Sequence, residues 1–395
     1  MKIVAKLVAQ GSIGLLRPDH EPLHRIVRDG RHSLNFFRLF LAWLVLYSHS
    51  FPLSGRGGDP PLAPFLKDIS PGAFAVGAFF VLSGYLIGGS AHRSVEAGIP
   101  GLRRFVSARF FRIWPALFVV LAASAFIVAP IMNSIAGLPL DEYLTFSSEG
   151  PFAYVLRNLF LPIDLQYGIL STFLETPYGV ATGVSSVNGS LWTLPFEIRC
   201  YALAAVLAVV LTSKQLSKGR PYLLAFFTAS ISILAIFHPP AFESTINLIL
   251  PSGRLWLIAL FLIGMTIDTV FRMIQLRGIF FVVAVGALIA SIYAGGNTFR
   301  IIGISSGVFI VMLSLKYTNK LVPAWFRNDL SYGFYLWAFV VQQSLAQVGE
   351  AMSMVTYITL STLLTGAIAM VSWFVIERPA LAFVNKAGEP QNPRR

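Results

Sequence analysis

The chain has 395 residues, of which 55% are hydrophobic and only 12% charged. Since a soluble globular domain carries about 25% charged residues, this composition excludes a soluble enzyme as the main body of the chain. The net charge of +12 would suit nucleic acid. The basic residues, however, lie in short segments between apolar runs, where anionic lipid headgroups are the better partner. We therefore predict a membrane protein that contacts lipids and no nucleic acid.

Apolar runs long enough to cross a bilayer follow one another through most of the chain. A hydrocarbon layer about 30 Å thick needs about 20 apolar residues per helix, and such runs recur between Asn35 and Ile376. The sequence predicts an all-α integral membrane protein with about ten transmembrane helices, at residues 34–53, 71–90, 113–133, 189–212, 221–237, 254–271, 278–294, 301–315, 331–348 and 354–376.

Lysine and arginine are distributed unevenly between the predicted loops. If the N-terminus is cytoplasmic, the inner segments hold 23 of the 30 basic residues and the outer segments hold 5. The other two, Arg38 and Arg199, lie within predicted spans. Because cytoplasmic loops collect Lys and Arg, we expect both termini to be cytoplasmic. Omitting one helix would invert every later loop and remove this asymmetry.

Three regions follow from this topology. Residues 1–33 carry six Lys or Arg and no apolar stretch of the kind found in signal peptides, so they are predicted to be a cytoplasmic basic segment. Residues 34–384 are the predicted polytopic membrane domain, and 385–395 a short cytoplasmic tail. The longest outer segment, 134–188, is predicted to be structured, with a short interfacial or re-entrant piece near 152–163.

The first predicted span contains two residues that are costly in a membrane, Arg38 and His49. A charge in the hydrocarbon layer costs at least about 2.5–3.5 kcal/mol, so each needs a reason to be there. Eleven residues of helix place them on one face, about 16 Å apart along the axis. A snorkelling anchor would explain Arg38, and a helix-packing hydrogen bond would explain His49. Their shared face favours a common cavity over these two separate explanations.

Further polar residues lie at comparable depths. Glu197, in the fourth predicted span, is at a depth that would permit a carboxylate–imidazole contact with His49, and a structural ion pair is its alternative role. Arg109 and Arg112 are three residues apart and share a helix face near the cytoplasmic boundary. Their guanidinium groups suit phosphate, although the positive-inside rule alone also explains a basic loop.

Two common kinds of site are not expected. The single cysteine, Cys200, excludes an internal disulfide and a cysteine metal cluster. The six histidines show no metal-ligand spacing, so we expect no metal and no bound cofactor. The Ser83-Gly84 pair in the second predicted span is, by itself, typical of ordinary small-residue helix packing.

Six segments in order resemble the acyltransferase 3 family, membrane-bound O-acyltransferases that modify bacterial surface and signalling glycans. The resemblance extends from about Leu34 to Val384, and one departure is Ala338, where the family often has a histidine. The matching segments are Arg38 with His49, Phe79–Leu86, Arg109–Arg112, Ser190–Leu194 with Glu197 to Tyr201, Ser331-Tyr332 with Tyr335-Leu336, and Ile376–Pro379.

The resemblance implies an enzyme of the bacterial inner membrane that takes part in polysaccharide biosynthesis. Its donor would be cytoplasmic acyl-CoA, most simply acetyl-CoA, and its acceptor a hydroxyl of a glycan or lipid-linked saccharide. His49 is then the predicted general base, with Glu197 orienting it and Arg38 guiding the donor. The predicted binding residues are Arg109, Arg112 and Arg38 for the donor phosphates, and Trp192, Ser83 and Tyr85 for substrate.

Two other classes of function remain open at this point. Intramembrane His, Glu and Arg also suit the proton or solute pathway of a secondary transporter or flippase. The chain shows neither the inverted repeat nor the paired broken helices that favour a transporter. A non-catalytic partner in a glycan-export assembly would tolerate alanine at the same polar positions.

Overall fold

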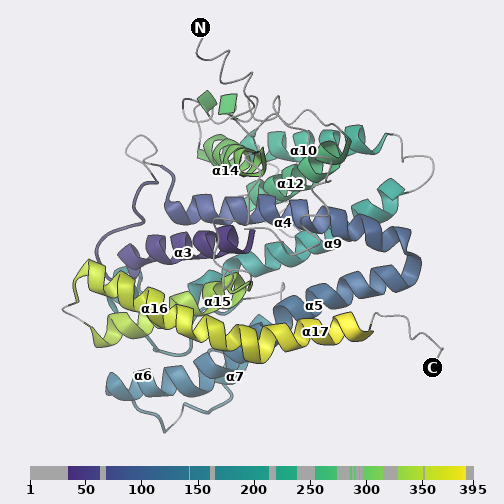
Figure 1. The fold of residues 1–395 in the computed structure, drawn as a ribbon. Helices are drawn as coiled ribbons and strands as arrows, with labels where there is room; N and C mark the ends of the chain where they lie inside the picture. Colours follow the sequence, from purple (N-terminus) through teal and green to yellow (C-terminus); the bar gives the residue numbers. More distant parts are fainter. Residues whose placement is uncertain are drawn as a thin grey trace, which may run out of the picture. The chain divides into compact units, whose positions relative to one another are not determined.

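A computed structural model of the protein describes a large part of the predicted membrane domain. The backbone is described for residues 34–62, 68–141, 143–160, 165–212, 219–237, 254–273, 297–314, 328–349 and 352–387, with five single positions between 285 and 293. Throughout these ranges the regular structure is helical, without strands (Figure 1). The predicted basic segment 1–33, most of the predicted span 278–294 and the end of the predicted tail lie outside the described residues.

Among the described residues, named helices overlap nine of the ten predicted spans, and the tenth, 278–294, is described at only five positions. Five of them are long and apolar enough to cross a membrane: Leu34–Leu53, Pro71–Glu96, Gly98–Ile135, Gly189–Val210 and Met354–Val384. Three shorter apolar helices cover Tyr222–Ile236, Leu255–Thr269 and Thr298–Phe309. The all-helical class is thus confirmed for the described residues, with five candidate membrane spans, while ten spans and cytoplasmic termini stay a prediction.

The described elements, in chain order, are α3 (Leu34–Leu53), α4 (Pro71–Glu96), α5 (Gly98–Ala123), η1 (Ser124–Val128), α6 (Ala129–Ile135), α7 (Pro151–Leu159), α8 (Pro177–Thr182), η2 (Gly189–Thr193), α9 (Leu194–Thr212), α10 (Arg220–Phe237), α12 (Leu255–Met273), α14 (Asn297–Ser314), α15 (Ser331–Val348), α16 (Met354–Ser372), η6 (Trp373–Glu377) and α17 (Arg378–Ala387). Both η1 and η6 are single π-helical turns that lead into a proline two residues after they end, Pro130 and Pro379. Because proline has no N–H and its ring crowds the carbonyl four residues earlier, a widened turn lets the helix continue past it.

The chain forms two compact units. The first contains residues Val76–Gly89 of α4 together with α10, α12 and α14. The second contains α3 from Arg38 onward, the two ends of α4, the helices from α5 to α9, and α15 to α17. Within the second unit, α16 packs along α15, and α17 packs against α5 (Figure 1).

The first unit is held by a close approach of α4 to α12. A Cβ atom on Gly84 would lie 1.9 Å from the carbonyl oxygen of Phe261, and one on Gly264 would lie 2.0 Å from that of Val81. The two backbones therefore touch directly, which only glycine permits. Thr228 and Thr266 share a 2.8 Å hydrogen bond between α10 and α12. Gly84 is thus a helix-packing residue, as the ordinary interpretation of its motif predicts.

The described residues of segment 134–188, which is predicted to lie outside, are structured, and part of this segment packs in the core of the second unit. Helix α7 overlaps most of the predicted interfacial piece and buries Tyr154 and Asn158. The Asn158 amide donates to the carbonyl of Gln166 at 2.7 Å and accepts from its N–H at 3.2 Å. The Asn158 side chain therefore satisfies both backbone hydrogen-bonding groups of Gln166, which would cost free energy if they were left unpaired.

Replacing Gly84 by alanine should destabilise the protein. In an open helix the change would stabilise by about 0.5–1 kcal/mol, but here the added methyl overlaps backbone and should cost about 1–3 kcal/mol. Gly366→Ala is the matched control, because nothing lies within 4 Å of the Cβ it adds in α16. Thermal unfolding in detergent measures both; an equal melting temperature for the two variants would contradict the packing contact.

Candidate functional site

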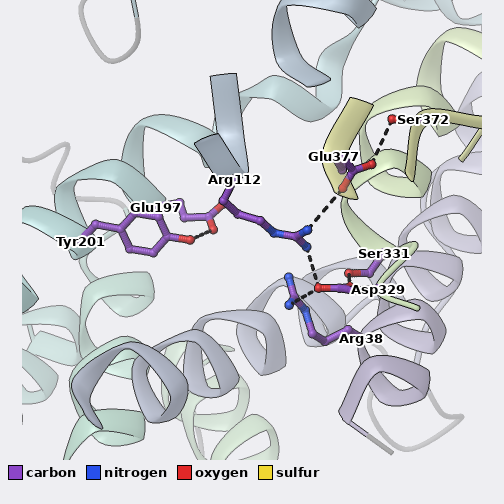
Figure 2. A network of polar contacts seen from close by, with 8 residues as sticks. All are labelled: Arg38, Arg112, Glu197, Tyr201, Asp329, Ser331, Ser372 and Glu377. Atoms are coloured by element: carbon purple, nitrogen blue, oxygen red, sulfur yellow. Dashed lines mark hydrogen bonds and ion pairs between the residues drawn. The ribbon is translucent and has the colours of Figure 1, made fainter. Parts of the chain in front are cut away.

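Two arginines of the second unit are held by two carboxylates (Figure 2). Arg38 Nη1 and Arg112 Nη2 both bond to the same oxygen, Asp329 Oδ2, at 2.6 and 2.7 Å. Arg112 Nη1 also lies 3.3 Å from Glu377 Oε2. The network joins α3, α5, the turn before α15 and the end of η6, so it connects the first described helix to segments near the C-terminus.

Short side chains hold the carboxylates in place. Ser331 donates to Asp329 Oδ1 at 2.6 Å, and Ser372 donates to Glu377 Oε1 at 3.0 Å. A Cβ on Gly333 would lie 2.8 Å from Glu377 Oε1, so the small residue in the first turn of α15 makes room for that carboxylate. Ser331 and Gly333 both lie in the predicted Ser331–Leu336 signature, whose role here is to accommodate Asp329 and Glu377.

The network balances its own charge in a place that water hardly reaches. The side chains of Glu377 and Arg112 are only 2% and 11% exposed. Burial alone would raise the pKa of Asp329, but Arg112 and Arg38 together hold that pKa below its ordinary value. Asp329 therefore stays ionised, and the two carboxylates match the two guanidinium charges.

Arg109 is in a different situation from the other two arginines. Its guanidinium carbon lies 5.7 Å from the ring centre of Phe105 and 5.8 Å from that of Tyr201. Among the described residues it forms no salt bridge, and its buried Nε has no hydrogen-bond partner. Arg109 and Arg112 are brought to the same region, as their spacing predicts, but only Arg109 keeps an unmatched hydrogen-bond donor.

Glu197 lies on the arginine side of the unit. Its carboxylate accepts a short hydrogen bond from the Tyr201 hydroxyl, one helical turn later on α9. It also interacts electrostatically with Arg109. Between Glu197 and His49, both described, the structure records no hydrogen bond or ion pair. The placement therefore favours association with Arg109 and Tyr201 over the carboxylate–imidazole contact that depth alone permits.

His49 lies further along the same face of α3. Its ring meets the ring of Phe339 edge-on, with centres 5.6 Å apart, and its Nδ1 is buried without a hydrogen-bond partner. Arg38 bonds to Asp329 just before α15, and His49 contacts Phe339 within α15. Both residues therefore face α15, which confirms the predicted shared face.

The three predicted substrate residues lie in two different places. Trp192 is in η2, half-buried, with its ring 6.3 Å from that of Phe196. Ser83 and Tyr85 belong to the first unit, where Tyr85 is buried with its ring 5.5 Å from that of Phe309. Their contact with substrate stays a prediction. No group of His, Cys, Asp and Glu suited to a metal occurs among the described residues.

Sequence reasoning did not identify the two carboxylates of the network. Glu377 offered a signal, because it is an acidic residue at the end of an apolar run and lies in a matched signature. Asp329 offered none, since it sits beside Arg327 and Asn328 like any acidic residue in a loop. Only the folded chain shows that both carboxylates face the same guanidinium group.

Buried paired charges and an unpaired imidazole on neighbouring helices are typical of a functional site, in an enzyme as in a transporter. The chain belongs to the acyltransferase 3 family, because the model of that family's acyltransferase domain matches residues 31–377. The protein is therefore an acyltransferase. Of the functions considered from the sequence, the family supports the enzyme over the transporter.

Two curated proteins are similar over nearly their whole length. The "O-acetyl transferase" of Shigella phage Sf6 is 28% identical over 363 residues, covering 88% of this chain and 96% of that protein. "Nodulation protein 10" of Rhizobium leguminosarum bv. viciae is 27% identical over 383 residues, covering 89% and 93%. No solved structure matches the chain significantly.

Removing the carboxylate shared by Arg38 and Arg112 should destabilise the second unit. Asp329→Ala leaves two buried guanidinium groups without their common partner, which should cost about 3–5 kcal/mol. Asp141→Ala, at an exposed loop acid, is the control and should leave the melting temperature unchanged. Thermal unfolding of both variants measures this, and a stable Asp329→Ala protein would show that the network is dispensable for folding.

Proposed function

We propose that this acyltransferase transfers an acyl group, most simply acetyl, from cytoplasmic acyl-CoA to a hydroxyl of a cell-surface or exported glycan or lipid-linked saccharide. It would do so in the inner membrane of a bacterium. The observation that carries the proposal is His49, whose buried Nδ1 has no partner on the helix face that also bears Arg38. The printed name of the phage relative supports acetyl as the group and oxygen as its acceptor.

The donor end of the site is assigned to the arginines. CoA carries several phosphates, and guanidinium groups bind phosphate through paired N–H donors. Arg38 and Arg112 already pair with carboxylates, so their charge is matched and their role is to shape the site. Arg109 has no salt bridge among the described residues, and we assign it the main contact with the donor phosphates. Glu197 and Tyr201 then set the position of Arg109.

The distance between the two ends fits the donor's shape. Arg38 and His49 are about 16 Å apart along α3, which is of the same order as the extended pantetheine arm of CoA. A donor with its phosphates at the arginines would present its thioester near His49. Donor from inside and acceptor from outside would make the reaction a transfer across the bilayer.

The chemistry assigned to His49 is proton removal. Neutral imidazole takes the proton of the acceptor hydroxyl, whose oxygen then forms the ester bond to the acyl carbon. The carbon–sulfur bond breaks, and the CoA thiolate leaves and takes up the proton. The unpartnered nitrogen supports this assignment, because a base must have a nitrogen available to accept the proton.

His49→Ala should abolish acyl transfer while the protein still folds and inserts into membranes. The test supplies acetyl-CoA labelled in its acetyl group to membranes from cells expressing the protein, and follows label in the saccharide fraction. Loss of the base should cost about 100-fold or more in rate. His92→Ala is the control, since His92 pairs with Glu96 on α4 and belongs to neither end of the site. Transfer near the unmodified level in His49→Ala would refute the assignment.

Arg109→Ala should raise the KM for acetyl-CoA by about tenfold or more, because it removes one charge-assisted phosphate contact. The melting temperature should change little, since no salt bridge of Arg109 is lost. Arg112→Ala is the comparison, and should instead lower the melting temperature by breaking two ion pairs. Unchanged donor kinetics in Arg109→Ala would show that this arginine serves topology only.

A further inference from the structure

Helix α15 accompanies α3 from the arginine end to the histidine end. Asp329, two residues before α15, binds Arg38. Ten residues further along the chain Phe339 contacts His49, which follows Arg38 by eleven residues. The two helices therefore run in the same direction within the second unit, and the two contacts are separated by similar lengths of chain, eleven and ten residues. Whatever fixes α15 against α3 also fixes where His49 points.

Gln342 makes the hydrogen bonds between these helices at the level of His49. It is fully buried, and its Nε2 donates to the carbonyl of Leu46 at 2.9 Å and to the hydroxyl of Ser50 at 2.8 Å. Ser50 in turn donates to the same Leu46 carbonyl at 2.8 Å. Leu46 lies three residues before His49 and Ser50 one residue after it. One amide thus holds the turn of α3 that bears the imidazole.

Neighbouring residues of α15 and α16 support the contact between Gln342 and α3. The hydroxyl of Tyr357, on α16, donates to the backbone carbonyl of Gln342 at 2.8 Å. Phe339 lies one turn before Gln342 on α15 and closes one side of the His49 ring. Because an amide in an apolar interior is costly to leave unbonded, rotation of α3 that broke these bonds would be strongly disfavoured.

We propose that Gln342 is a positioning residue for His49, which fixes the rotation of α3 so that the imidazole holds one orientation toward the reacting atoms. The proposal rests on the proposed function, in which His49 is the base. Gln342 touches no reacting atom. Its loss should therefore slow the chemical step and leave donor binding, which is assigned to the arginines, unchanged.

The next residue in the chain provides a matched control. Gln343 is the same residue type, is equally buried on α15, and also donates a hydrogen bond through Nε2, but to the carbonyl of Ser186 at 2.9 Å. Its amide makes no hydrogen bond to α3. A role in folding alone would make the two glutamines equivalent, whereas positioning of His49 would make them differ in kcat.

The experiment compares Gln342→Leu with Gln343→Leu in the full-length protein in nanodiscs. The donor is acetyl-CoA labelled in its acetyl group, and the acceptor is the envelope saccharide fraction of the expressing cells. Gln342→Leu should lower kcat by roughly tenfold or more, with the KM for acetyl-CoA unchanged. Gln343→Leu should keep its kcat at temperatures where it is folded. Equal kcat in Gln342→Leu and the unmodified protein, or equal losses in both variants, would overturn the proposal.

A milder variant covers the case in which Gln342→Leu does not fold. Ser50→Ala removes one of the two acceptors of the Gln342 amide and leaves the other, so kcat should fall by roughly threefold at constant KM. An unchanged kcat would then overturn the proposal. His49→Ala separates this inference from the proposed function: if it retains transfer, the proposed function fails. If it loses transfer while Gln342→Leu and Ser50→Ala keep full kcat, only the positioning role fails.

Discussion

The cost of burying arginine in an apolar interior is the constraint on which the rest of the site depends. An unpaired guanidinium there costs several kcal/mol, and removing one partner of a buried ion pair strongly destabilises the folded protein. Ion pairs with Asp329 and Glu377 offset this cost for Arg38 and Arg112. These four residues come from segments far apart in the sequence, so pairing their charges brings α3, α5, the turn before α15 and the end of η6 to one point.

Beyond this charged cluster, uncharged polar groups hold the rest of α3 in position. Asp329, in the turn before α15, holds Arg38, and the amide of Gln342 within α15 holds the turn that carries His49. The charged contact thus lies at the start of α15, and the neutral hydrogen bonds lie further along it. His49 itself is left with an unpartnered nitrogen, which is the one polar atom of α3 that the proposed chemistry needs.

Much of this arrangement could be predicted from local pattern. The helical period alone placed Arg38 and His49 on one face, and the run from Leu34 to Leu53 set the bounds of α3. Gly84 was identified as a packing residue from its small size in an apolar run. Glu197 shows the limit of such reasoning: its depth agreed with His49, but depth does not give direction. The side chain is bonded to Tyr201, on the arginine side.

The sequence by itself determined the all-helical class, most of the described helices and the polar residues that are costly within them, because hydropathy and helical period are properties of neighbouring residues. It also determined the family, because six short segments in order are specific together. Only the tertiary structure decided which arginine has its charge matched and which does not, and which glutamine reaches α3. These outcomes depend on pairs such as Arg112 with Glu377 and Leu46 with Gln342, which are 265 and 296 residues apart in the chain. No local pattern carries information over such a separation, because the partner is chosen by how whole helices pack.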